Sequence, residues 1–211
     1  DPSTPDDGTI VQLWNYVSDH ADRLTFLTYQ HASLAFQTVL VGTLVAIAIA
    51  IGVYRLPLVS SLTLTTSRIA LTIPSLALLA LLIVPFGLGV VPGLISTVIF
   101  AIPAPIRLTQ LGVATVPTPL KEAGLAFGAT RKQLLWKVEL PYALPMIMTG
   151  INQCIMLSLS MVVIAALVGA GGLGKPVVRA LNTVNIPMGF EAGLAIVLLA
   201  ILLDRVCKRP E

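Results

Sequence analysis

The sequence predicts an all-α membrane protein with five transmembrane helices, and three observations support that prediction. Of the 211 residues, 56% are hydrophobic and only 11% are charged, whereas a soluble domain carries about 25% charged residues. Five apolar segments are each long enough to cross a bilayer, which takes roughly 20 residues per helix. Lysine and arginine gather on one side of these segments. The composition disfavours the alternative, a soluble domain with a very large core; the mean hydropathy is +0.92.

The five predicted spans differ in how proline interrupts them. They cover residues 34–53, 69–84, 91–108, 142–168 and 188–203. The second contains Pro74, and the third contains Pro103 and Pro105 near its end. Proline within a span is tolerated where neighbouring helices or a cavity satisfy the freed carbonyl groups. We therefore expect spans two and three to lie inside the helix bundle.

The distribution of basic residues predicts the orientation, because cytoplasmic loops carry an excess of lysine and arginine. With the N-terminus outside, the outer side holds only Arg23, Lys175 and Arg179. The inner side then holds the other ten of the 13 basic residues: Arg55, Arg68, Arg107, Lys121, Arg131, Lys132, Lys137, Arg205, Lys208 and Arg209. We therefore expect an N-out, C-in topology.

This orientation divides the chain into three parts. Residues 1–33 form an external segment, in which Ile10, Leu13, Trp14 and Val17 recur at helical spacing and indicate a short interfacial helix. Residues 34–204 form the transmembrane domain, with a cytoplasmic loop at 118–141, and residues 205–211 form a cytoplasmic tail. The net charge of +3 is explained by the positive inner side and not by nucleic-acid binding.

The polar loop at 118–141 predicts two short helices joined at a glycine. Thr118 as cap and Pro119 at the first helical position favour a helix start, and Gly128 is a natural stop. Thr130 and Gln133 have the spacing of a capping box, which starts a second helix. On that helix Leu134, Leu135 and Val138 form an apolar ridge, and Pro141 is expected to end it.

This loop resembles the cytoplasmic loop of the permease subunits of type I ABC importers. The family pattern is Glu-Ala-Ala, a glycine six residues after the glutamate, nine further residues, and a hydrophobic-x-Leu-Pro ending. The chain carries Glu122, Ala123, Gly124, Gly128, Val138, Leu140 and Pro141 at these spacings. Gly124 departs from the pattern, because the family has a third small residue, alanine, there.

The resemblance implies a role for each matching residue. The loop would dock into a groove of an ATPase subunit and transmit its motion to the spans. Glu122 and Ala123 would belong to the docking helix, with Glu122 anchoring polar contacts. Gly124 and Gly128 would provide close packing and the elbow, and Leu140-Pro141 would form the junction with span four.

The similarity extends over most of the spans, at 73–82, 137–148, 158–174 and 190–205, to the branch that imports quaternary-amine osmoprotectants. It implies glycine betaine, carnitine or choline as substrate. It also implies a second permease subunit in a homodimer or heterodimer, two cytoplasmic ATPase subunits that bind the ATP and Mg²⁺, and an extracellular substrate-binding protein. The expected location is the plasma (inner) membrane of a bacterium or archaeon, among membrane lipid.

Two alternatives stay open. The chain could be a type I permease for another small solute, such as an amino acid or a sulfonate. It could instead be a non-transporting membrane scaffold that uses the same loop for docking.

Polar residues within the spans are candidates for lining the solute pathway. They are Asn152, Gln153, Ser158 and Ser160 in span four and Glu191 at the start of span five. The alternative is that they form hydrogen bonds between helices or lie at the membrane interface. His20 and His31 are expected outside without companion ligands, so we expect no metal site. No Ser/His/Asp or Cys/His set indicates catalysis.

The glycine-rich segment 169–175 fits two nucleotide-binding patterns, G-x-G-x-x-G and G-x-x-x-x-G-K. Pro176 stands where a phosphate loop needs serine or threonine, and the predicted topology places the segment outside. We therefore expect a tight external turn that allows close helix approach.

Overall fold

The computed structural model of the protein describes residues 11, 14, 15 and 17–207. Within this part of the chain every regular element is helical. The α-helices are α2 (Ala21–Val53), α3 (Pro57–Thr72), α4 (Ser75–Phe86), α5 (Val90–Ala101), α6 (Pro103–Ala114), α7 (Thr118–Ala126), α8 (Arg131–Leu134), α9 (Leu140–Ala165), α10 (Gly174–Thr183) and α11 (Ile186–Cys207). The π-helical turn η1 (Leu135–Glu139) joins α8 to α9, and the short 3-10 helix η2 (Ala166–Val168) follows α9.

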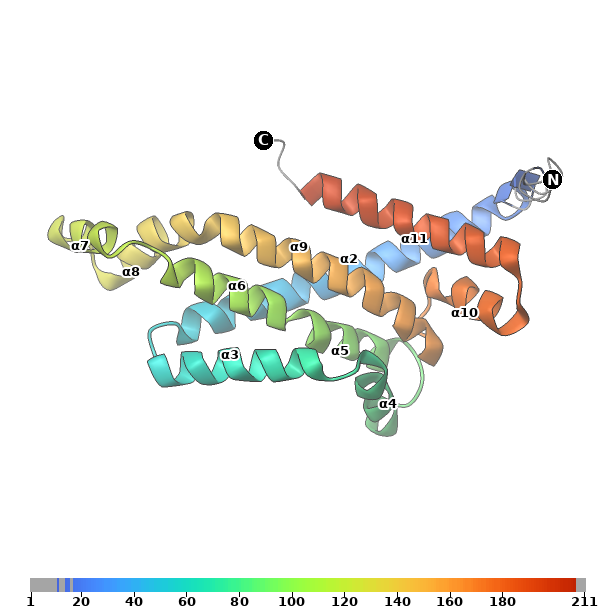
Figure 1. Cartoon of the computed structure of the whole chain (residues 1–211), viewed down its shortest axis with the longest axis horizontal. Helices are drawn as coiled ribbons and strands as arrows, with labels where there is room; N and C mark the ends of the chain where they lie inside the picture. The colour runs from blue at the N-terminus through green and yellow to red at the C-terminus, as the bar shows by residue number, and fades with distance from the viewer. Residues whose placement is uncertain (1–10, 12–13, 16, 208–211) are drawn as a thin grey trace, which may run out of the picture.

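Helix α9 is the central element of the bundle and packs against α2, α5, α6 and α11. The helices α2, α9 and α11 run along the long axis, with α7 and α8 at one end and α10 at the other (Figure 1). Leu34 of α2 and Leu159 of α9 belong to the largest apolar core. Helix α6 approaches α9 closely because position 150 is glycine. A Cβ there would lie 3.0 Å from the Cα of Pro105.

Four helical stretches in the described residues are long and apolar enough to cross a membrane: Ala21–Val53, Val90–Ala114, Arg131–Val168 and Ile186–Val206. Predicted spans one, three, four and five fall within them. The helices α3 and α4 meet at an angle of 95° and add a fifth crossing if the pair counts as one span. The all-helical prediction is confirmed for the described residues, which contain four or five candidate spans.

The second predicted span is wrong as a continuous helix. Helix α3 ends at Thr72, and Ile73 is extended, with φ −71° and ψ 124°. The cause is Pro74, which disfavours helical geometry in the residue before it. Arg68, which we expected before the span, lies inside α3 and is exposed.

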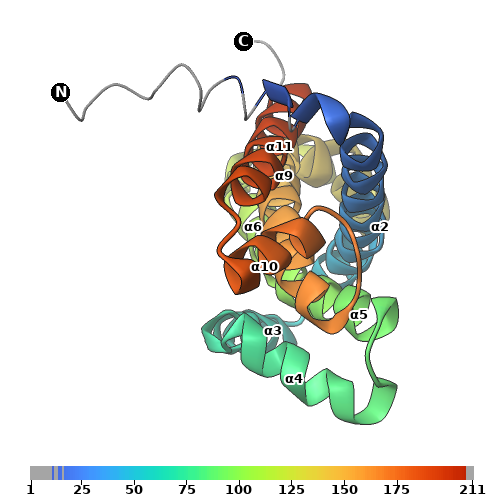
Figure 2. The same ribbon diagram turned by 90° about the vertical axis from the view of Figure 1, so that its right-hand side faces the viewer.

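The predicted interior position is right for span three and wrong for span two. Half of the most apolar window of Val90–Ala114 is buried, whereas α3 and α4 each bury one residue, Ser67 and Leu79. Viewed along the bundle, α3 and α4 stand at its edge (Figure 2).

The helix that contains the first span begins at Ala21 instead of residue 34. Of the predicted interfacial helix, Ile10 and Leu13 lie outside the described residues. Trp14 and Val17 are helical, and Trp14 is exposed. Its position is compatible with an interfacial anchor, which stays a prediction.

The glycine-rich segment forms the predicted tight turn. Gly169, Gly171 and Gly172 all have positive φ, which only glycine adopts at little cost. The backbone N–H of Gly172 donates a hydrogen bond of 2.9 Å to Oε1 of Gln30 in α2. His31, which we expected on the outer side, is fully buried against this turn. The turn holds α10 to α2.

Candidate functional site

The loop at 118–141 folds as two short helices around Gly128. Helix α7 ends at Ala126, and Gly128, with φ +81°, donates its N–H to the Leu125 carbonyl at 2.9 Å. Thr130 and Gln133 form the predicted capping box: Gln133 N–H donates to Thr130 Oγ1 at 3.3 Å, and Thr130 N–H donates to Gln133 Oε1 at 2.8 Å. The predicted glycine elbow and second helix start are confirmed.

Two details of the loop differ from the prediction. Pro117 occupies the cap position, and Thr118 is the first helical residue without a capping hydrogen bond. Pro141 does not end a helix, because α8, η1 and α9 form one continuous stretch, Arg131–Val168. Pro141 lies in the first turn of α9, directly after the π turn η1.

The predicted apolar ridge faces the interior of the protein. Leu134 and Leu135 are buried, and Val138 is partly buried. The exposed apolar side chains lie instead on and beside α7, at Leu125 and at Phe127, which is 92% exposed. No residue of α7 is buried. Helix α7 lies at the end of the bundle (Figure 1), contacts α8 and η1, and leaves apolar side chains exposed.

The residues of the family pattern divide by exposure. Glu122, Ala123, Gly128 and Pro141 are exposed, and Gly124 and Leu140 are partly buried. A Cβ at Gly124 would lie 2.7 Å from Cδ1 of Leu134, so a small residue there lets α7 lie close to α8. The contact with α8 explains why position 124 needs a small residue. The exposed Glu122 and Ala123 stay available for contact with a partner subunit.

The sequence analysis missed Glu139, a buried acidic residue in the π turn, which is 4% exposed. Its carboxylate meets Tyr54, Arg55 and Lys121, which come from the end of α2 and from α7. The Arg55 guanidinium lies 5.1 Å from the centroid of the Tyr54 ring, and Arg55 Nε also donates to the Tyr54 hydroxyl. One signal was available in the sequence: an acidic residue between apolar neighbours at the start of a span.

This cluster predicts a pH dependence at Tyr54, just beyond the last residue of α2. Burial, together with the hydrogen bond to Glu139, raises the pKa of Tyr54 from 10.0 to about 12. Because the pKa of Tyr54 is raised in the folded protein, the hydrogen bond from Tyr54 to Glu139 contributes fully to folding stability below pH 10. This contribution is lost as the pH rises through 12. Absorbance titration of the protein against Tyr54→Phe should show a tyrosine that ionises near pH 12. The Glu139→Gln variant should lower that value, and ionisation of Tyr54 at pH 10 would contradict the cluster.

The five candidate pathway residues do not share one surface. On α9, Ser158 is buried and Asn152 is partly buried, whereas Gln153 and Ser160 are exposed. Ser160 Oγ donates to the Met156 carbonyl of its own helix at 3.1 Å. A role in lining the solute path stays a prediction for each of them.

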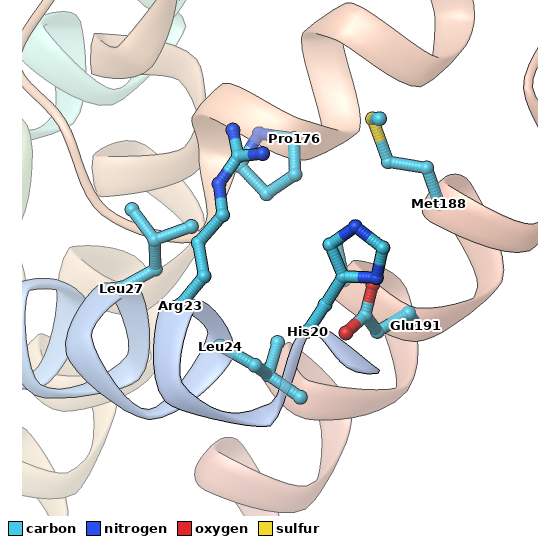
Figure 3. A pocket seen from close by; sticks show the side chains of 8 residues that line it. His20, Arg23, Leu24, Leu27, Pro176, Met188 and Glu191 are labelled. Atoms are coloured by element: carbon cyan, nitrogen blue, oxygen red, sulfur yellow. The ribbon is translucent and has the colours of Figure 1, made fainter. Parts of the chain in front are cut away.

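Glu191 lies apart from the other four, at the opposite end of the bundle from α7. It is buried and lines a small pocket with His20 and Arg23 from the start of α2 and with Pro176 of α10 (Figure 3). The described residues contain no group of three or more histidine, cysteine, aspartate or glutamate side chains that could bind a metal ion.

The fold and the sequence define a class of membrane transport protein. Residues 40–208 match the family "Binding-protein-dependent transport system inner membrane component". The chain belongs to this family, and with its candidate spans it is a multi-pass membrane protein.

The individual relatives make the similarity more specific. The chain is 45% identical over 179 residues to the glycine betaine transport system permease protein OpuAB of Bacillus subtilis (strain 168), covering 85% of this chain and 64% of OpuAB. It is 33% identical over 202 residues to the osmoprotectant import permease protein OsmW of Salmonella typhimurium (strain LT2), covering 93% of this chain and 94% of OsmW. The chain thus spans slightly less than two thirds of OpuAB.

The fold has a counterpart among solved structures. It matches an inward-facing conformation of the MetNI methionine ABC transporter with a TM-score of 0.74, at 22% identity, over 88% of this chain and 96% of the other. At this identity the match establishes the fold alone.

Proposed function

We propose that this chain is the membrane-spanning permease subunit of an ABC importer for quaternary ammonium osmoprotectants. The observation with the greatest weight is the 45% identity to a glycine betaine permease, which spans most of the helices. The protruding α7, with exposed Glu122 and Ala123 at the family's spacing, supports a docking role for this end. Glycine betaine, carnitine and choline are the proposed substrates.

The proposal includes five spans in an N-out, C-in orientation, with α7 and α8 in the cytoplasm. Lys121, Arg131, Lys132 and Lys137 all belong to this end of the bundle, which supports the cytoplasmic placement. A cysteine at the exposed position 127 should react with a membrane-impermeant maleimide from the cytoplasmic side only. Labelling from outside in intact cells would reverse the topology.

The proposed assembly contains a second permease subunit, two cytoplasmic ATPase subunits that bind ATP and Mg²⁺, and an extracellular substrate-binding protein. The exposed faces of α3, α4 and α7 offer this chain's contact surfaces. Closure of the ATPases would push the paired α7–α8 segments together. The spans would then alternate between inward-open and outward-open states biased by nucleotide.

The test is uptake of radiolabelled glycine betaine by proteoliposomes that contain the chain with its ATPase and binding protein. Uptake should require ATP, and excess choline or carnitine should compete, whereas methionine should not. Competition by methionine or a sulfonate alone would support the permease for another solute. ATPase binding without ATP-dependent uptake of any of these solutes would support the docking scaffold.

A further inference from the structure

Glu139 is a buried acidic group at a junction of three elements. It is 4% exposed and ends the π turn η1, which carries the loop into α9. A buried carboxylate is destabilising unless it is paired and hydrogen-bonded. π turns inside α-helices are frequently found at functional sites. The burial of the Glu139 carboxylate and its place in a π turn both indicate that Glu139 does more than fill space in the core.

The partners of Glu139 come from two other elements. The Tyr54 hydroxyl donates to Oε2 at 2.7 Å, and Nη2 of Arg55 lies 3.6 Å from the same oxygen. From α7, Nζ of Lys121 lies 4.0 Å from Oε1. Both carboxylate oxygens are therefore engaged, one by the end of α2 and one by the protruding helix.

Arg55 extends the junction to the second half of the loop. Its Nη2 also donates a hydrogen bond of 2.7 Å to the backbone carbonyl of Arg131, the first residue of α8. The end of α2 is thus joined to α7 through Glu139 and to α8 through Arg55. We define these four residues, Tyr54, Arg55, Lys121 and Glu139, as the junction cluster.

The loop has a covalent connection to α9 and only a non-covalent one to α2. Helices α8, η1 and α9 are continuous, so a displacement of α8 moves α9 directly. Helix α7 has no buried residue and packs against α8 and η1. The described polar contacts between the loop and the end of α2 pass through the junction cluster.

We propose that Glu139 is a positioning residue that makes α2 move together with the loop when the ATPase subunits displace it. The inference rests on the proposed function as an ABC importer permease. Glu139 touches neither solute nor nucleotide; it acts by holding the end of α2 on the loop. Without it, the end of α2 keeps only the Arg55–Arg131 hydrogen bond and its packing against α9, so it follows the displacement of the loop less closely.

The test is Glu139→Gln, which keeps the size of the side chain and removes its charge. Proteoliposomes with the complete transporter report ATP hydrolysis and radiolabelled glycine betaine uptake in the same vesicles. We expect uptake to fall about tenfold, within the 5–150-fold range of typical coupling energies. ATP hydrolysis should change by less than about twofold, so more ATP is used for each solute. Glu139→Asp, which keeps the charge, should restore part of the coupling.

A second readout does not depend on the solute. Spin labels at Leu56, just after α2, and at Phe127 measure the distance between α2 and the loop in a variant with Cys154 and Cys207 replaced by alanine. Both labelled positions are exposed. In the otherwise unchanged protein the distance should stay constant between the nucleotide-free and ATP-bound states. In Glu139→Gln it should change or broaden on ATP binding.

Two further variants distinguish a loss of coupling from misfolding of Glu139→Gln. Arg55→Gln removes the guanidinium that contacts Glu139, Arg131 and Tyr54. Because this side chain is about one third exposed, the protein should fold and show the same uncoupling more weakly. Asp19→Asn removes an exposed acidic group near the start of α2 and should change neither readout.

The outcomes separate the two proposals. An unchanged ratio of ATP to solute and a constant distance in Glu139→Gln would overturn the junction role. Absence of ATP-dependent glycine betaine uptake in the unsubstituted transporter would overturn the proposed substrate instead. The distance measurement would then still decide the role of Glu139.

Discussion

Replacing Gly128 with proline should abolish solute uptake while the protein stays in the membrane. Gly128 has φ +81°, and its N–H bonds to the Leu125 carbonyl at 2.9 Å. Proline fixes φ near −65° and has no N–H, so it removes the bond and turns the chain after α7 in another direction. The docking helix would then be misaligned with the ATPase. Uptake in proteoliposomes, normalised to the permease present by immunoblot, measures the effect.

Two comparisons make this expectation specific. Gly128→Asn should keep most of the uptake, because asparagine tolerates left-handed backbone better than other residues with a side chain. Glu122→Lys reverses an exposed charge on α7 without touching the core, and it should also abolish uptake at a normal protein level. Uptake at the unsubstituted rate in both Gly128→Pro and Glu122→Lys would contradict the assignment of this loop as the coupling element.

Local chemistry made the loop predictable from sequence. A glycine stop and a Thr-x-x-Gln box act within three or four residues, so the sequence contains all the information that determines them. Thr118 failed as a cap because it lies between two prolines, and Pro117 fixes the chain one residue earlier. Pro141 was misread because a proline that ends a helix and a proline that follows a π turn inside a continuous helical stretch look alike in sequence.

Hydropathy located the spans but could not place their breaks. Residues 69–84 are mostly apolar, and a window average does not register the turn at Ile73 and Pro74. The position of α3 and α4 at the edge of the bundle depends on packing between distant segments. The presence of Pro74 led us to place span two inside the bundle, and that prediction is wrong.

The junction cluster was beyond sequence reasoning because its partners are far apart in the chain. Tyr54 and Glu139 are separated by 85 positions, and the contact between Gln30 and Gly172 spans 142. Pairings of this kind exist only after the helices have packed. A single sequence shows an unusual buried acid at most, and not the residues that satisfy it.

The second large effect, on stability, is expected for Gly174→Ala at the first residue of α10, whereas the same substitution at Gly193 should not destabilise the protein. A Cβ at Gly174 would lie 2.5 Å from the Val163 carbonyl oxygen and 2.6 Å from Cβ of Ala166. A Cβ at Gly193 in α11 would have no neighbour within 4 Å. Alanine has a higher helix propensity than glycine by about 1 kcal/mol, so Gly193→Ala should be neutral or slightly stabilising.

At Gly174 the steric conflict outweighs the propensity, because the obstructing Val163 atoms belong to the α9 backbone and Cβ of Ala166 in η2 has no rotamer that would move it away. Overpacking of this kind costs about 1–3 kcal/mol, and the shift would also loosen the turn that holds α10 against α2. Gly174→Ala should therefore lower the thermal midpoint of the detergent-solubilised protein, measured by the fraction that stays monodisperse after heating. Equal midpoints for Gly174→Ala and Gly193→Ala would mean that α10 is not held against α9 as closely as the structure places it.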